Sequence, residues 1–408
     1  MKWKPIRQTK TYSPGRIIWK RFKSNKLALS GFIILIIFII AGLMGYLITP
    51  DKSPQANEQH VELATQKPGF KVNLLMLRKN EVGNKLSLWR KITSGERSIY
   101  RMIPISSYKF EGSDIIITEY TGEEEDMDFS LRYSIADVIW PLDPNTKPVM
   151  DKSGNIRANL INNDSISEQL VAIQRIIKEK HIVKKHYFLG TDRFGRDMLS
   201  RMILGARVSL SVGMVAVLIS LLIGITLGMI AGFFGGRVDQ AIMWLISVVW
   251  SIPTLLMVIA ISLALGQGFW QVFVAIGLTM WVDVARVVRG QVMSLREKEF
   301  IEAARALGFP SLRIMFKHLL PNLTGPVVVI AAANFASAIL MEAGLSFLGI
   351  GVQPPIPSWG GMIKDHYGFI IVDKAFLAII PGLAIMIMVL AFMLMGNGLR
   401  DATDQSSA

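Results

Sequence analysis

The chain has 408 residues, no cysteine and 51% hydrophobic residues, with 44 Lys and Arg against 31 Asp and Glu. This apolar content predicts a membrane protein, and the lack of cysteine excludes disulfides. The net charge of +13 does not indicate nucleic-acid binding, because residues 1–26 alone hold nine Lys or Arg and no acid. A basic block before an apolar span favours a cytoplasmic N-terminus, with attraction to anionic membrane lipid as a secondary use.

Six apolar segments are candidates to cross the ~30 Å hydrocarbon core of a bilayer. The first, residues 27–48, is interpreted as an uncleaved span, because it is too long for a signal peptide and no small-residue cleavage site follows. The other expected spans are 208–234, 240–265, 269–288, 323–345 and 375–399. Six crossings return the C-terminus to the cytoplasm, and they put the loop between spans four and five there as well.

The segment 51–185 is too long for a simple connection between spans. It holds 20 basic and 19 acidic residues, and this mixed composition argues against disorder throughout. Alternating β-prone residues predict strands within 71–79 and 98–120. Apolar residues at helical spacing predict a helix over Ser165–Lys180, and residues 51–68 are expected to be floppy. We therefore expect an inserted α+β periplasmic domain, which contacts either a binding protein or only a partner subunit.

Two further patterns lie in the expected spans. Gly224, Gly228 and Gly232 form a small-residue stripe that favours close contact between helices. Pro253, Pro326 and Pro381 lie inside or at the start of spans, where proline permits kinks. The glycines predict tight packing, and the prolines are candidate points of flexing.

The loop at residues 297–322 is charged and amphipathic, and it lies between apolar runs. Its residues at helical spacing on one face are Phe300, Ala303, Ala304 and Leu307. Gly308 and Pro310 are placed to end this helix. A short helix with small residues on its apolar face suits docking into a groove of another protein, whereas periodicity alone also fits an ordinary surface helix.

Several motifs occur in one order between Gly190 and about Asp404. They are Gly190–Asp197 (GTDRFGRD), Gly235–Asp239 (GGRVD), Glu302-Ala303-Ala304 followed by Gly308 and His318–Pro321, Leu345–Pro355, Pro381–Ala384 and Gly398–Asp401. This combination resembles the C-type permease subunits of ABC importers for oligopeptides and dipeptides, with nickel importers as close cousins. The resemblance covers slightly over half of the chain and leaves out most of the insert.

The resemblance implies an all-α polytopic membrane protein with the six-helix fold of type I ABC importer permeases, interrupted by the insert. The expected division is a basic cytoplasmic N-terminus (1–26), a first transmembrane helix (27–48), the periplasmic insert (51–185) and the permease domain (190–408) with its coupling loop (297–322). The location implied is the bacterial inner membrane, with both termini in the cytoplasm.

The resemblance also implies site residues. Those expected in the ATPase-coupling loop are Glu302, Ala303, Ala304, Gly308, His318 and Pro321. Glu342, Gln353 and Pro354 are candidates for the translocation path or gate, although Glu342 could equally pair with a partner subunit. Because an ionisable residue in a span is costly, Glu342 carries a functional hypothesis by default.

No phosphate-binding Gly-x-x-x-x-Gly-Lys-Ser/Thr sequence occurs, so the chain is expected to be neither an enzyme nor a holder of cofactors. ATP and Mg would be used by two partner ABC ATPase subunits. The other implied partners are a homologous B-type permease, an extracytoplasmic solute-binding protein and a peptide substrate. The five His lack metal-ligand spacing, and His318 is expected to brace the coupling loop. The alternatives are a permease for nickel or another small solute, a stand-alone secondary transporter, and a membrane-anchored sensor.

Overall fold

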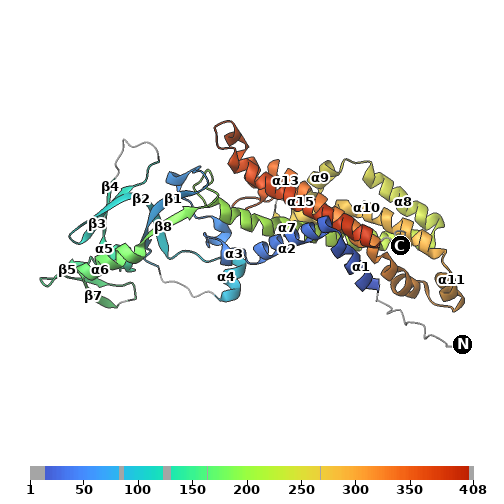
Figure 1. The fold of residues 1–408 in the computed structure, drawn as a ribbon, viewed down its shortest axis with the longest axis horizontal. Helices are drawn as coiled ribbons and strands as arrows, with labels where there is room; N and C mark the ends of the chain where they lie inside the picture. The colour runs from blue at the N-terminus through green and yellow to red at the C-terminus, as the bar shows by residue number, and fades with distance from the viewer. Residues whose placement is uncertain (1–13, 82–86, 123–129, 163, 267, 404–408) are drawn as a thin grey trace, which may run out of the picture.

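The protein is long and divided into two parts in the computed structural model, which describes residues 14–81, 87–122, 130–162, 164–266 and 268–403. Sheets form one end of the molecule, and long helices form the rest (Figure 1). The first described helix (Pro14–Ser24), the last described residues (up to Thr403) and helix α11 (Glu299–Ala306) lie at the other end. We call these two ends the sheet end and the terminal end.

Five helices in the described residues are long and apolar enough to cross a membrane. They contain α2 (Lys26–Leu43), α7 (Met198–Phe234), α10 (Phe269–Arg296), α13 (Thr324–Phe347) and α15 (Phe376–Thr403). Helix α7 packs along α10, and α15 packs against α13 and α2. Short helices lie before and after α2, namely α1 (Pro14–Ser24) and α3 (Gly45–Ile48). The five long helices overlap five of the six predicted spans.

The predicted span at 240–265 is sharply bent at the proline where the sequence permits a kink: this segment forms two helices that meet at 90°. They are α8 (Gly236–Trp250) and α9 (Thr254–Leu265). Pro253 explains the break: it has no N–H to donate, and its ring disfavours a helical residue before it. The pair still crosses the bundle, since a Cβ on Gly235 would be 3.1 Å from Arg296 at the terminal end. Phe269, which follows α9, lines a cavity at the sheet end.

The other two prolines lie where the sequence places them. Pro381 is inside α15, and Pro326 lies in the first turn of α13. A proline in a first turn removes no intrahelical hydrogen bond, so Pro326 fits a straight helix start.

The glycine stripe of α7 faces α10, as its spacing predicts. A Cβ added at Gly228 would lie 2.6 Å from the carbonyl oxygen of Ala285, and one at Gly224 would lie 2.7 Å from that of Trp281. Backbone atoms cannot move aside as a flexible side chain can. The glycine stripe therefore allows the close approach of α7 and α10.

Replacing Gly228 by Ala is expected to destabilise the subunit by about 1–3 kcal/mol, because the added methyl overpacks the α7–α10 contact. Gly290→Ala is the matched control, since a methyl added at that glycine of α10 would have no atom within 4 Å. Thermal unfolding in detergent measures both. Equal melting temperatures for the two variants would contradict this account.

The sheet domain spans residues 70–187 and is α+β, as predicted, between the first span and the others. Its larger sheet has the antiparallel order β4-β3-β2-β1-β8. These strands are β1 (Phe70–Arg78), β2 (Tyr100–Glu111), β3 (Asp114–Glu119), β4 (Ser130–Ser134) and β8 (Ile182–Tyr187). A smaller sheet contains β5 (Val149–Met150), β6 (Asn155–Asn159) and β7 (Ser165–Gln169).

Three short helices complete the sheet domain: α4 (Leu88–Ser94), α5 (Ile135–Ile139) and α6 (Leu170–Ile176). Side chains from α5, α6 and the larger sheet share one apolar core. Its fully buried members are Leu75, Ile115, Ile117, Ile135, Ala136, Val138, Ile173 and Ile177. The domain thus has a hydrophobic core of its own.

Two predictions for this region are wrong. The helix expected over Ser165–Lys180 begins only at Leu170, because Ser165–Gln169 alternates between exposed and half-buried residues and pairs with β6. The segment 51–68 is not floppy: it contains the helical turns Pro54–Ala56 and Val61–Leu63, and Asp51 N–H donates to Ser200 Oγ at 2.9 Å.

Candidate functional site

Helix α11 projects from the terminal end and stops where the sequence predicts. Its last residue is Ala306, and Gly308 follows with φ +75°, a left-handed conformation that favours glycine. The Gly308 N–H donates to the Arg305 carbonyl at 2.9 Å, and the Phe309 N–H donates to that of Ala304 at 3.1 Å. Pro310 then starts the next short helix, Ser311–Arg313. The turn that closes α11 is therefore fully hydrogen-bonded.

The buried face of α11 is not the one that the sequence predicts. Ile301 and Ala304 are buried, in a cluster with Phe233 of α7 and Val292 of α10. Phe300 and Ala303 are instead exposed, and Leu307 is 71% exposed. Only Ala304 of the expected face packs inward. Ile301 is the anchor that sequence reasoning missed.

The exposed residues Phe300, Ala303 and Leu307 are spaced i, i+3 and i+7, so they share one side of α11. We call this surface the coupling patch. Two more large apolar residues, Leu312 and Phe316, are exposed in the segment that follows. The acids Glu299 and Glu302 lie in the first turn of α11, where the helix dipole favours negative charge. Exposed apolar surface with a charged rim is typical of a protein-binding surface.

His318 and Pro321 support this segment from behind. The His318 ring stacks on Phe309 with centroids 5.9 Å apart, and its carbonyl accepts from Asn322 Nδ2 at 2.6 Å. Pro321 lies in the helical turn Leu320–Leu323, which leads into α13. Among the described residues, no group of three His, Asp or Glu is placed to hold a metal ion. A bracing role for His318 stays a prediction, which its contact with Phe309 supports.

The GGRVD motif (Gly235–Asp239) connects the start of α8 to α10 through an ion pair. Asp239 of α8 accepts two hydrogen bonds from Arg289 of α10, at 2.5 and 2.7 Å. Arg296 Nη1 donates to the carbonyl of Phe233 at 3.3 Å, and the Arg305 guanidinium lies 5.3 Å from the Phe233 ring. The ends of α7, α8 and α10 are thus tied together directly beneath α11.

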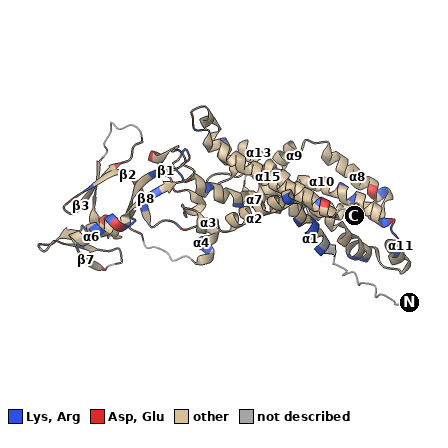
Figure 2. Cartoon of the chain, viewed as in Figure 1, with Lys and Arg blue, Asp and Glu red and all other residues tan. Residues whose placement is uncertain are grey.

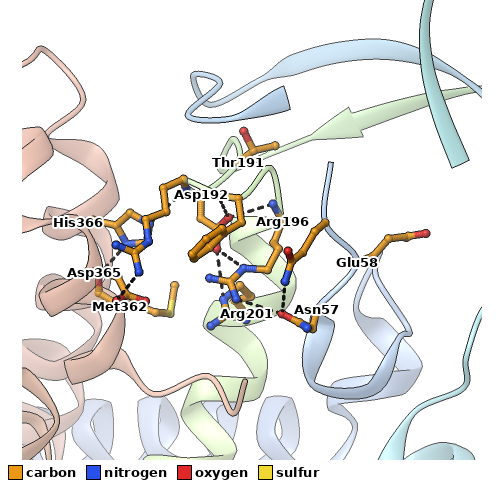
Figure 3. A network of polar contacts seen from close by, with 12 residues as sticks. Asn57, Glu58, Thr191, Asp192, Arg196, Arg201, Met362, Asp365 and His366 are labelled. Carbon is orange, nitrogen blue, oxygen red and sulfur yellow. Dashed lines mark hydrogen bonds and ion pairs between the residues drawn. The ribbon is translucent and has the colours of Figure 1, made fainter. Parts of the chain in front are cut away.

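A second polar network lies at the sheet end and is built on the GTDRFGRD motif (Figure 3). Asp192 is fully buried and accepts from Arg196 Nε at 2.6 Å, while Arg201 Nε lies 3.6 Å from the same carboxylate oxygen. Arg196 Nη1 also donates to Asn57 Oδ1 at 3.0 Å. We call this group the outer hub, and it joins the 51–68 segment to α7.

The outer hub continues to helix α14 (Trp359–His366). Arg193 Nη2 donates to Asp365 at 3.1 Å, and the Arg193 N–H donates to His366 Nε2 at 3.4 Å. His366 Nδ1 faces the Met362 carbonyl at 2.7 Å, so Nδ1 carries the proton. Burial lowers the pKa of His366, which keeps the ring neutral and Nε2 free to accept.

Comparison with known proteins decides the family. Residues 224–407 match the family described as the binding-protein-dependent transport system inner membrane component, and residues 13–68 match the N-terminal TM domain of oligopeptide transport permease C. The chain is 47% identical over 219 residues to the oligopeptide transport system permease protein OppC of Escherichia coli K12, covering 54% of this chain and 72% of that protein. It belongs to this permease family.

A second relative is the dipeptide transport system permease protein DppC of Alkalihalophilus pseudofirmus, which is 44% identical over 220 residues, 54% of this chain and 72% of that protein. Among solved structures, the MetNI methionine ABC transporter in an inward-facing conformation aligns with a TM-score of 0.43 and 18% identity, over 51% of this chain and 98% of that chain. The family match and the similarity to OppC make this permease an inner-membrane transport component and not an enzyme. Its sheet domain lies between the two matched regions.

The permease's candidate gate residues lie in and after the last turns of α13. Glu342 is fully buried, and its carboxylate accepts from Ser346 Oγ at 2.7 Å. Ser346 Oγ in turn accepts from the Val352 N–H at 3.1 Å. Glu342 is therefore linked through Ser346 to the chain reversal after α13, and its role in the path or gate stays a prediction.

Gln353 and Pro354 lie on that reversal. Gln353 Nε2 donates to the carbonyls of Gly349 and Gly351, at 2.9 and 3.0 Å. Both residues line a small cleft that also contains Arg201 of the outer hub. The gate candidates and the outer hub are therefore neighbours.

Proposed function

We propose that this chain is the permease C subunit of an ATP-driven importer that carries oligopeptides or dipeptides across the inner membrane. The coupling patch is the observation that carries the proposal. Helix α11 exposes Phe300 and Leu307 at the terminal end, while Ile301 packs against the spans. This arrangement suits a surface that binds a partner subunit and passes the partner's movement to the spans. The substrate class is supported by the oligopeptide and dipeptide permeases that the chain resembles.

The proposed partners follow from what the chain lacks and what it exposes. Two ABC ATPase subunits would bind ATP and Mg, and one of them would receive the coupling patch. A homologous B-type permease would complete the path, and an extracytoplasmic solute-binding protein would deliver peptide at the sheet end. We expect the specificity for particular peptides to lie largely in that binding protein.

The proposed orientation places the terminal end in the cytoplasm and the sheet end in the periplasm. The nine Lys or Arg of residues 1–26 support this orientation through the positive-inside rule. Figure 2 shows the members of this group that lie on α1, and further basic residues near the start of α8 and α11. With this orientation, the domain division is a cytoplasmic N-terminus, a first span, the periplasmic insert at 51–185 and the permease domain at 190–408.

In the proposed mechanism, ATP binding draws the two ATPases together and moves α11. Ile301 and Ala304 transmit the movement to α7 and α10, because these side chains share one buried cluster. The Asp239–Arg289 pair keeps α8 in step with α10. Such coupling needs α11 to make different contacts in the inward- and outward-facing states, since a ligand shifts an equilibrium only through its differential affinity.

The test is uptake of a radiolabelled tripeptide by cells that lack their own peptide permease and carry this transporter's complete set of subunits. Omitting the chain is expected to abolish uptake. Glu302→Lys is expected to reduce uptake at least tenfold without loss of the subunit from the membrane, because it reverses an exposed charge in the first turn of α11.

The matched control is Glu81→Lys, which reverses an exposed charge at the sheet end and should leave the ATPase contact intact. Uptake that persists without the chain would contradict the transport function. Normal uptake by the Glu302 variant would contradict the coupling role alone.

A further inference from the structure

Helix α4 of the sheet domain exposes its two largest apolar side chains. Leu88 is 77% exposed and Trp89 is 74% exposed, although both belong to an ordered seven-residue helix. The same helix carries Arg90 and Lys91 and no acidic residue. An isolated helix this short is not stable in water, so α4 depends on its neighbours. No described residue of the subunit covers its exposed side.

The neighbours of α4 fix it at the sheet end of the membrane-spanning helices. A Cβ on Gly95, which caps α4, would lie 2.7 Å from Tyr46 of α3 and 2.7 Å from the Lys52 carbonyl. The Glu96 N–H donates to that same carbonyl at 2.8 Å. Helix α4 therefore packs on α3, which directly continues the first span (Figure 1).

Arg207 of α7 holds α4 from a second side. Its Nη1 donates to the carbonyls of Ile92 and Thr93, at 3.4 and 3.1 Å, which are groups that a helix end leaves unpaired. A cavity of about 820 Å³ separates this contact from α10, and Trp270, near the start of α10, lines it together with Thr93. The end of the first span and the first turns of α7 thus hold α4, and the start of α10 lies across the cavity from it.

Helix α4 lies next to a span whose apolar surface is mostly exposed. Only 22% of the α2 span is buried inside the subunit. Its exposed apolar residues continue into α3, where Leu47 and Ile48 are exposed as well. Tryptophan is enriched at the membrane–water interface, where its ring and its N–H meet apolar and polar surroundings. Arginine and lysine beside it complement lipid phosphates.

We propose that α4 is an interfacial anchor that inserts Leu88 and Trp89 into the headgroup region of the phospholipid leaflet at the sheet end. Arg90 then lies among the lipid phosphates. The anchor holds the sheet domain at a fixed height over the bundle. This inference rests on the membrane location of the family and not on the proposed peptide transport or coupling.

The absence of cysteine from the sequence allows a direct test, because one introduced cysteine is labelled uniquely. The variant Leu88→Cys keeps Trp89 and takes a nitroxide spin label. The full-length chain is reconstituted with its transporter partners in vesicles of phosphatidylcholine and phosphatidylglycerol. Power-saturation EPR then compares collision with oxygen, which enriches in lipid, and with a water-soluble nickel chelate.

Two control sites bracket the result. Val171→Cys, at a position 74% exposed on α6, reports the aqueous side of the sheet domain, and Ile40→Cys, on the exposed side of α2, reports lipid. The label at residue 88 is expected to collide with oxygen several-fold more than at residue 171, and with the nickel chelate several-fold less. Its depth should fall between the two controls.

Adding Trp89→Ser to the Leu88→Cys variant is expected to move the label toward the aqueous values, which a merely nearby bilayer would not do. Aqueous behaviour of the original label would overturn the anchor. Low collision with both reagents would overturn it too, because it would mean that a protein partner covers α4. Peptide uptake, measured on the same vesicles, reports separately on the proposed function.

Discussion

Replacing Leu307 by Asp is expected to abolish peptide uptake while the subunit remains folded in the membrane. Leu307 is 71% exposed, so the change removes little buried surface from the subunit itself. In the assembled transporter, however, it would put a charge into the coupling patch, in place of its most exposed large apolar side chain. Central apolar contacts contribute about 2–4 kcal/mol to protein interfaces, which corresponds to roughly 30- to 1000-fold in affinity.

The measurement is co-purification of the ATPase subunits with the tagged permease, together with uptake in the same cells. Val171→Asp is the matched control, because it introduces the same charge at an equally exposed position in the sheet domain. ATPase recovery should fall for the Leu307 variant and stay normal for the control. If both variants kept their ATPases and their uptake, the coupling patch would not be the docking surface.

Replacing Asp192 by Asn is expected to cost about 3–5 kcal/mol of stability, the largest effect of a single substitution in the outer hub. Arg196 and Arg201 are each only 4% exposed, and Asp192 is the one carboxylate that the described residues place within ion-pair distance of either. Asparagine would leave two buried positive charges without a counter-charge. The Arg196–Asn57 hydrogen bond, one of several contacts that hold the 51–68 segment, would be disturbed with them.

Asp365→Asn is the control for that prediction. The Arg193–Asp365 pair is at the same end, but it is partly exposed, so its loss should cost about 0–1 kcal/mol. Thermal unfolding in detergent gives the ranking, and limited proteolysis of residues 51–68 reports their release. Similar melting temperatures for both variants would show that the outer hub is not held by the Asp192 carboxylate.

The spans and the coupling helix are predictable from sequence because they depend on long apolar runs and on local ending signals. Gly308 and Pro310 end α11 whatever it packs against. The break at Pro253 is harder to foresee, since proline inside a span kinks one helix and divides another, and neighbouring helices decide which. The strand at Ser165–Gln169 escapes prediction because its partner, β6, is a tertiary contact.

The buried side of α11 could not be derived from periodicity. The helix carries apolar residues on two sides, one through Ile301 and Ala304 and one through Phe300 and Leu307. Spacing alone does not say which side meets the subunit and which meets a partner. Likewise, the charged residues of the GTDRFGRD motif are evident in the sequence, but their partners Asn57 and Asp365 are not. These partners lie more than a hundred residues away along the chain.

The strand order of the larger sheet has an evolutionary consequence. Strand β1 opens the sheet domain and β8 closes it, and they are antiparallel neighbours with Phe70 opposite Tyr187. Paired residues of this kind have Cα atoms about 5 Å apart. The two chain connections between the sheet domain and the permease therefore lie side by side. A domain whose ends are adjacent can be inserted, replaced or deleted during evolution at one position of the host chain. The fold of the transmembrane helices can stay the same.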